Sequence, residues 1–166
     1  MIEVRIASLA LDPQSNQPVI VLKPLLEKPG ESRLLPIWIG HPEATAILLA
    51  LEGVEPPRPL THDLMKGMLD SLHTYLERVE ITRVEESTFF AALILRAEEH
   101  QVAVDARPSD SIALAIRMGA PLFVADEVLD AAAIPDESVG GPANEEAELQ
   151  AFRDFLESVN PEDFQS

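Results

Sequence analysis

Two Arg-Pro pairs constrain the fold of this chain more than any other feature, because each one marks a place where a helix begins. The first stands in Arg58-Pro59-Leu60-Thr61-His62-Asp63-Leu64 and the second in Arg107-Pro108-Ser109-Asp110-Ser111-Ile112. A hydroxyl residue follows each pair, and the oxygen of Ser or Thr can accept a hydrogen bond from an unpaired backbone N–H in the first turn of a helix. We therefore predict that Thr61 and Ser109 cap two helices. Asp63 and Asp110 then lie in the first turns, where the helix dipole favours a carboxylate.

The chain before the first Arg-Pro pair predicts three strands and one helix. Residues 2–11 alternate in part between apolar and charged, and residues 18–26 and 33–39 are largely apolar with β-branched members. Because short turns separate these segments, we predict an antiparallel meander. Apolar residues at helical spacing between Pro42 and Gly53 then predict a helix.

The rest of the body predicts further strands on both sides of the second Arg-Pro pair. Residues 76–85, 88–98 and 101–106 have strand-like patterns, and residues 121–124 form a short apolar run. The segment 89–95 is apolar on both faces, which favours a central strand. We predict an α+β fold with a mixed, largely antiparallel sheet of about seven strands and three main helices.

The C-terminal part of the chain differs from the body in charge and composition. Residues 126–166 hold twelve acidic residues and one arginine, and the whole chain has a net charge of −17. We predict a body at 1–135 and an appendage at 136–166, in which a flexible linker leads to an amphipathic helix. Such a negative field repels polyanions and weakens non-specific binding to nucleic acid.

Several kinds of protein are disfavoured by what the sequence lacks. There is no cysteine, so disulfides, thiolate metal sites and cysteine nucleophiles are ruled out. No apolar run is long enough to span a bilayer, and the first residues do not have the layout of a signal peptide. We therefore expect a cytoplasmic protein with no membrane partner. The sequence also lacks a phosphate-binding glycine loop, a nucleophile elbow and a zinc-binding HExxH motif.

Three motifs, in this order, resemble the bifunctional nuclease family. They are Leu35-Pro36-Ile37-Trp38-Ile39-Gly40 with Glu43-Ala44, the segment from Arg58 to Leu64, and the segment from Ala106 to Ala115. The resemblance covers residues 1–135, and the acidic tail is similar to that of actinobacterial members. It implies a compact α+β fold that is often oligomeric, so we expect a homo-oligomer. It also implies a nuclease activity on both RNA and DNA, with nucleic acid as the partner.

The basic residues near the two helix starts are candidates for binding a phosphate group. Arg58 and Arg107 each offer a planar, permanently charged fork that matches phosphate oxygens. Lys66 and Ser109 would add a charge and a hydroxyl donor at the same helix ends. The alternative interpretation is that each arginine pairs with its neighbouring aspartate and braces its own loop.

The acidic residues and one histidine are candidates for the chemistry. Because oxygen ligands suit magnesium or manganese, we predict that Glu43, Asp63 and Asp110 hold such a divalent ion. Asp63 and Asp110 would also belong to the catalytic group, with His62 assisting proton transfer as a general base. In the alternative, the two aspartates only stabilise their helix dipoles and His62 is an exposed, solvated residue.

The leading hypothesis is therefore a metal-assisted nuclease that hydrolyses phosphodiester bonds of RNA and DNA. The alternative is a non-catalytic module that senses an anion or nucleotide, or serves as an oligomeric scaffold. The net charge of −17 favours this alternative. The nuclease hypothesis requires the two Arg-Pro loops to meet in space, whereas internal ion pairs that lock them would argue against it.

Overall fold

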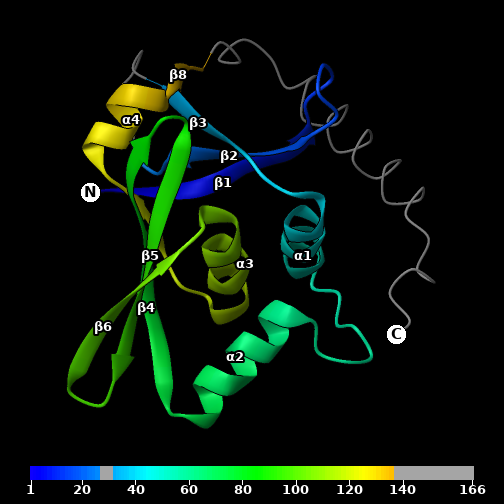
Figure 1. The fold of residues 1–166 in the computed structure, drawn as a ribbon, viewed down its shortest axis with the longest axis vertical. Helices are drawn as coiled ribbons and strands as arrows, with labels where there is room; N and C mark the ends of the chain where they lie inside the picture. Colours follow the sequence, from blue (N-terminus) through cyan, green and yellow to red (C-terminus); the bar gives the residue numbers. More distant parts are fainter. Residues whose placement is uncertain (27–31, 137–166) are drawn as a thin grey trace.

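A computed structural model of the chain describes residues 1–26 and 32–136 (Figure 1). Its elements follow one another in the order β1 (Ile2–Leu11), β2 (Pro18–Pro24), β3 (Arg33–Trp38), α1 (His41–Leu51), α2 (Thr61–Ser71), β4 (Thr74–Glu85), β5 (Thr88–Ala97), β6 (His100–Ala106), α3 (Pro108–Met118), β7 (Leu122–Val124), α4 (Asp126–Ala132) and β8 (Ile134–Pro135). No helix in the described part is both long and apolar enough to cross a lipid bilayer.

The described strands form one eight-stranded sheet in the order β6-β5-β4-β7-β1-β2-β3-β8. Strands β4 and β7 pair in parallel, whereas every other neighbouring pair is antiparallel. The first three strands form the predicted meander, and the predicted α+β fold with a mixed, largely antiparallel sheet is confirmed. The strand that the prediction omits is β8, which has two residues and is too short to show a period in the sequence.

The apolar segment 89–95 does not mark the centre of the sheet, so that prediction is wrong. It lies in β5, second from the edge, and the middle of the sheet is β7 and β1. One face of β5 places Ala91 and Leu93 in the core. Elsewhere on β5, the centre of the Phe90 ring lies 3.8 Å from the guanidinium of Arg83, which belongs to β4. A long charged side chain can cover an aromatic ring in this way, so a strand near the edge tolerates apolar residues on both faces.

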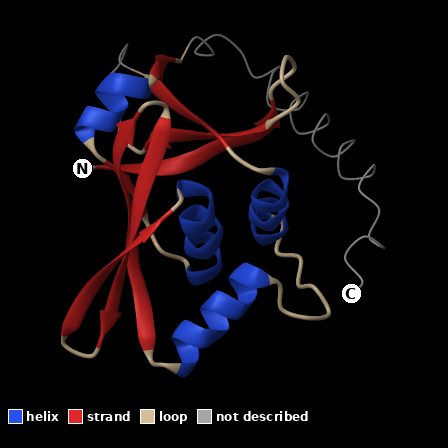
Figure 2. Cartoon of the chain, viewed as in Figure 1, coloured by secondary structure: helices blue, strands red, loops and turns tan. Residues whose placement is uncertain are grey.

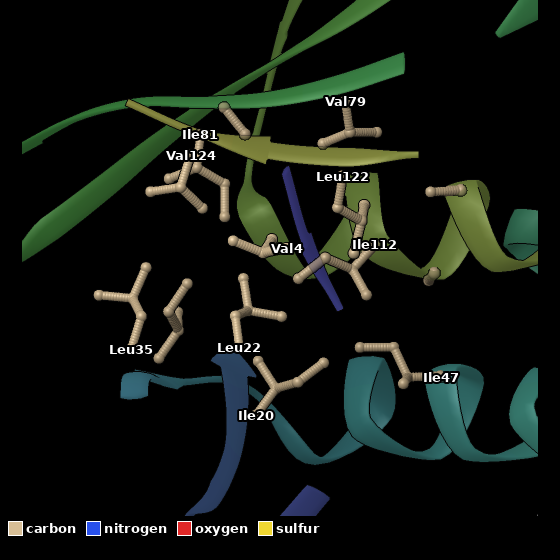
Figure 3. Packing of buried hydrophobic residues seen from close by; sticks show 14 of the residues in the cluster. Val4, Ile20, Leu22, Leu35, Ile47, Val79, Ile81, Ile112, Leu122 and Val124 are labelled. Carbon is tan, nitrogen blue, oxygen red and sulfur yellow. The ribbon is translucent and has the colours of Figure 1, made fainter. Parts of the chain in front are cut away.

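Helix α3 occupies the middle of the fold, where it packs against α1, α2 and the sheet. Its Ile112 and Leu114 are fully buried, as the helical spacing of its apolar residues requires. Figure 3 shows Ile112 close to Leu122 of β7, with Ile20 and Leu22 of the meander below them in the view. Figure 2 shows α1, α2 and α3 gathered in the bend of the sheet. This arrangement brings the starts of α2 and α3 into one region.

The body of the chain continues to the last described residue. Strand β8 pairs with β3, and the side chain of Asp136 is only 3% exposed. The Nζ of Lys23 donates a hydrogen bond of 2.7 Å to Asp136, and the hydroxyl of Ser32 donates one of 3.0 Å. Asp136, where the predicted linker begins, is therefore anchored to the sheet, whereas the rest of that linker and the predicted C-terminal helix lie outside the described residues.

Two glycines are expected to respond in opposite ways to replacement by alanine. Gly119 ends α3 with a φ of +66°, a left-handed conformation that costs an L-residue about 1–2 kcal/mol. Gly67 is exposed within α2, and an added Cβ at either glycine would meet no atom within 4 Å. We expect Gly119→Ala to lower the free energy of unfolding by about 1 kcal/mol, and Gly67→Ala to raise it by about 0.5–1 kcal/mol. Urea unfolding measures both changes, and shifts of the same sign would contradict the expectation.

Candidate functional site

The starts of α2 and α3 meet through the side chains of His62 and Asp110. The Nε2 atom of His62 lies 3.0 Å from Oδ1 of Asp110, although the two residues are 48 positions apart in the sequence. They come together because α2 packs directly against α3. The two Arg-Pro motifs therefore meet in space, as the nuclease hypothesis requires.

Arg107 extends this contact toward α1. Its Nε donates a hydrogen bond of 2.7 Å to Oδ2 of Asp110, and its Nη2 donates one of 2.8 Å to Oε1 of Glu43. Glu43 lies in the first turn of α1, and the residue before that helix is Gly40. A methyl group at Gly40 would overlap the Glu43 carboxylate, so the glycine leaves room for it. Four side chains thus form one connected row, Glu43–Arg107–Asp110–His62, which we call the charged row.

A second ion pair joins α2 and α3 beside the charged row. The Nε of Arg117, in the last turn of α3, donates a hydrogen bond of 2.6 Å to Oδ1 of Asp63. Arg117 is absent from the residues predicted for the site. A basic residue in the last turn of a helix is common, because it interacts favourably with the helix dipole. The available signal was its spacing from Asp110, because residues seven apart lie on the same face of a helix.

The predicted helix caps are wrong at both helices. The N-cap positions are occupied by Leu60 and Arg107, and neither contributes a side-chain cap. Thr61 is instead the first residue of α2, and Ser109 is a buried residue in the first turn of α3. At α2 the backbone N–H of Leu60 donates a hydrogen bond of 2.9 Å to Oδ2 of Asp63. This carboxylate therefore serves both the helix start and the ion pair with α3.

His62 is buried, in contrast to the solvated histidine of the alternative interpretation. Only 8% of its side chain is exposed, and its one hydrogen bond uses Nε2. No fully buried side-chain nitrogen or oxygen in the described part lacks a partner, so Nδ1 must remain accessible to solvent. We assign the proton to Nε2 because a charged carboxylate can only accept a hydrogen bond. A neutral His62 then presents the lone pair of Nδ1, as a general base must.

The aspartates at the two helix starts are held in their charged forms. Burial acts to raise the pKa of Asp110, but the hydrogen bonds from Arg107 and His62 outweigh it and the pKa falls below its usual value. Burial likewise opposes the hydrogen bonds from Arg117 and from the backbone of Leu60 to Asp63, and the pKa of Asp63 is also lowered. Both carboxylates therefore remain acceptors for their partners across the neutral pH range.

We expect the acid stability of the fold to depend in part on Asp63. Its folded-state pKa lies below the ordinary value of 3.8, so its stabilising contribution is complete at neutral pH. That contribution disappears as the pH falls below about 4 and through the folded pKa. Thermal melts at pH values from about 7 to about 3 should show the wild type and Asp63→Asn converging at the acidic end. A gap in melting temperature that does not change with pH would contradict the prediction.

The other predicted phosphate-binding residues lie outside the contacts of the charged row. Arg58 is exposed in the connector before α2 and makes no hydrogen bond or ion pair with another described residue. The Nζ of Lys66 lies 2.8 Å from Oδ2 of Asp70, one turn further along α2. Ser109 is buried, and its hydroxyl, which bonds no described residue, must still reach solvent. The structure thus joins Arg107 to the histidine through Asp110, but it does not join Arg58, Lys66 or Ser109 to it.

The carboxylates predicted to hold magnesium or manganese are not gathered into one ligand group. Within residues 1–26 and 32–136, no cluster of three or more His, Asp or Glu side chains is arranged to hold a metal ion. Glu43 and Asp110 both bond Arg107, whereas Asp63 bonds Arg117. These guanidinium groups supply the positive charge that a divalent ion would otherwise supply. The residues as placed therefore do not fit the predicted metal site.

Comparison with known proteins shows the family of this chain. The bifunctional nuclease domain model matches residues 24–137, a segment that contains the charged row and the pair of Asp63 with Arg117. The chain belongs to the bifunctional nuclease domain family. A protein of Mycobacterium tuberculosis that bears the name "uncharacterized protein" is 45% identical to it over 168 residues, which cover 99% of this chain and 98% of that protein.

Plant members of the bifunctional nuclease family match the chain over part of their length. Bifunctional nuclease 1 of Arabidopsis thaliana is 31% identical over 110 residues, which cover 64% of this chain and 33% of the plant protein. Bifunctional nuclease 1 of Oryza sativa subsp. japonica is 30% identical over 98 residues, which cover 57% of this chain and 30% of the plant protein. The matched segments thus span about a third of each plant protein.

Proposed function

We propose that this member of the bifunctional nuclease family hydrolyses phosphodiester bonds in RNA and DNA. The observation that carries the proposal is the 3.0 Å contact between His62 and Asp110, which holds a histidine base between two helix starts. Helix N-termini and arginines attract phosphate groups, and both are present beside this pair. The names of the plant relatives add support for nuclease chemistry.

His62 acts as the general base in this proposal. Asp110 accepts the Nε2–H and thereby maintains the tautomer that leaves Nδ1 free. Nδ1 takes a proton from a water molecule, whose oxygen bonds the phosphorus atom while the bond from phosphorus to the leaving nucleotide oxygen breaks. The leaving oxygen takes up a proton from solvent. No step passes through a metal ion, because the predicted carboxylate ligands bond arginines instead.

Arg107 binds the phosphate in this proposal. Its side chain is 66% exposed, and two of the five N–H donors of its guanidinium are engaged, by Asp110 and by Glu43. Three donors therefore remain for phosphate oxygens. The carboxylates of Glu43 and Asp110 carry two negative charges, whereas the guanidinium of Arg107 carries one positive charge. A second positive charge is therefore needed to attract a phosphate. The exposed Arg58 is the candidate for this role.

Cleavage of end-labelled RNA and DNA by the full chain tests the proposed function. We expect cleavage in buffer with EDTA as well as with magnesium or manganese, since the proposed base does not require an ion. Cleavage that appears only with a divalent ion would keep the nuclease but replace the mechanism, because the carboxylates would have to regroup around that ion. If neither RNA nor DNA is cleaved under any of these conditions, the proposal is refuted.

We expect Arg107→Gln to weaken the binding of a labelled oligonucleotide. Loss of charged hydrogen bonds to a phosphate costs about 1.5–3 kcal/mol, which corresponds to an increase of about 10- to 100-fold in Kd. Fluorescence anisotropy measures this increase. Arg83→Gln is the matched control, because Arg83 is also exposed and paired with a carboxylate but lies in β4. Equal binding by the two variants would exclude Arg107 as a phosphate ligand.

A non-catalytic anion-binding module is the second candidate function, and the ion pairs of Arg107 favour it. Arg107 pairs with its neighbouring Asp110, as the alternative interpretation of the sequence requires, and Glu43 braces it from α1. At the first motif, Asp63 pairs with Arg117 and not with Arg58. The net charge of −17 also opposes the approach of a long polyanion. In that case nucleotides or oligonucleotides would bind to the wild type without being cleaved.

A further inference from the structure

Without its polar contacts, α2 would be held only weakly against the body, because few of its apolar side chains are buried. His62 is its one buried residue, and Met65 and Leu69 pack only in part against the core. Two large apolar side chains of α2, Leu64 and Met68, are more than half exposed, and so is Leu72, which follows the helix. A helix of this length is marginal by itself in water, so its place on the body depends strongly on its polar contacts.

Two polar contacts join α2 to α3, and they engage adjacent residues of α2. Asp110 bonds His62, and two helical turns further along α3 Arg117 bonds Asp63. Because residues seven apart share one face of a helix, Asp110 and Arg117 both point toward α2. Helix α3 thus presents a carboxylate and a guanidinium to an imidazole and a carboxylate on α2.

The Arg117 contact is held at both of its ends. The Nη1 of Arg117 donates a hydrogen bond of 2.8 Å to the carbonyl oxygen of Ala113, and the side chain is only 8% exposed. On the other side, Asp63 accepts the backbone N–H of Leu60 while it bonds Arg117. The contact therefore anchors the first turn of α2, from which the His62 side chain projects.

We propose that Arg117 is the positioning residue that holds His62 in register with Asp110. Arg117 bonds neither His62 nor Asp110, so it acts through the backbone of α2. The effect of Arg117 on catalysis rests on the proposed function, in which His62 is the base. The effect of Arg117 on the geometry of His62 does not depend on any activity.

Nitrogen NMR of protein labelled with ¹⁵N in histidine tests the geometric consequence. The wild type should show the His62 ring with a protonated Nε2 and an unprotonated Nδ1, assigned by the loss of these signals in His62→Gln. Arg117→Gln should move both signals toward the average of a freely exchanging imidazole, and Arg117→Lys should fall between. Arg83→Gln, which removes an exposed guanidinium from β4, should leave them in place. Unchanged His62 signals in folded Arg117→Gln would overturn the proposal.

The kinetic consequence separates a positioning role from a general structural one. We expect kcat of Arg117→Gln to fall by about 10- to 100-fold with KM unchanged, the size expected when a catalytic group is displaced by about 1 Å. Circular dichroism at the assay temperature confirms that the variant is folded. If Arg117→Gln does not fold, Asp63→Asn and Arg117→Lys carry the same NMR test, and wild-type signals in both would overturn the proposal. A wild type without nuclease activity would refute the proposed function and still leave the NMR outcome decisive for Arg117.

Discussion

His62→Gln is expected to lower kcat for phosphodiester cleavage by about 10²- to 10⁴-fold, the usual contribution of a general base. Glutamine has nearly the reach of histidine, and its amide can donate a hydrogen bond to Asp110 in place of Nε2–H. It has no lone pair on nitrogen that can take a proton. The variant therefore removes the base while it keeps the contact between α2 and α3, so the melting temperature should change little.

His100→Gln is the matched control for this experiment. His100 is exposed at the start of β6 and makes no side-chain hydrogen bond to another described residue. Its replacement should leave kcat and KM at the values of the wild type. An equal loss of activity in both variants would point to a general effect on the preparation. Full activity in His62→Gln would remove His62 from the mechanism and shift the balance toward the anion-binding module.

Asp110→Asn is expected to combine a large loss of activity with a loss of stability. The amide of asparagine carries no charge that can pair with the guanidinium of Arg107. It can also present an N–H to Nε2 of His62 in place of an acceptor oxygen. Once the tautomer of a catalytic histidine is no longer maintained, kcat falls by about 10² or more. The hydrogen bonds to charged groups that are lost or weakened should lower the free energy of unfolding by about 1.5–3 kcal/mol.

Asp105→Asn is the control for Asp110→Asn. Asp105 lies five residues earlier on the exposed strand β6 and has no ion pair with another described residue. The two variants change the net charge equally, so a difference between them reports the charged row and not the overall field. Initial rates and urea unfolding measured on both proteins provide the comparison. Indistinguishable rates would show that Asp110 does not orient the base.

Most elements of the fold were predicted well because they carry a local signal. The meander follows from short turns between apolar segments, and helix α3 follows from a proline at its start and a glycine in the left-handed conformation at its end. Errors arose where the local signal is weak or shared. A two-residue strand such as β8 has no period, and apolar residues on both faces of β5 do not distinguish a central strand from a strand next to the edge.

The contacts of the candidate site could be predicted only in part. The two Arg-Pro motifs indicated which helix starts carry charged residues, and Arg107 with Asp110 forms the local pair that one interpretation anticipated. Three partners in the structure come from distant positions: Glu43 reaches Arg107, His62 reaches Asp110, and Arg117 reaches Asp63. No spacing within one element encodes such pairs.

The amino-acid sequence by itself determined the order of strands and helices, the two helix starts and the residue types available to the site, because these depend on neighbours along the chain. Only the tertiary structure decided that the carboxylates face guanidinium groups instead of one another. The packing of α2 on α3 made that choice, since it buried His62 against Asp110 and placed Arg117 against Asp63. A charged group that is buried must pair with an opposite charge or form hydrogen bonds. The helices that pack around the group determine which partner is available.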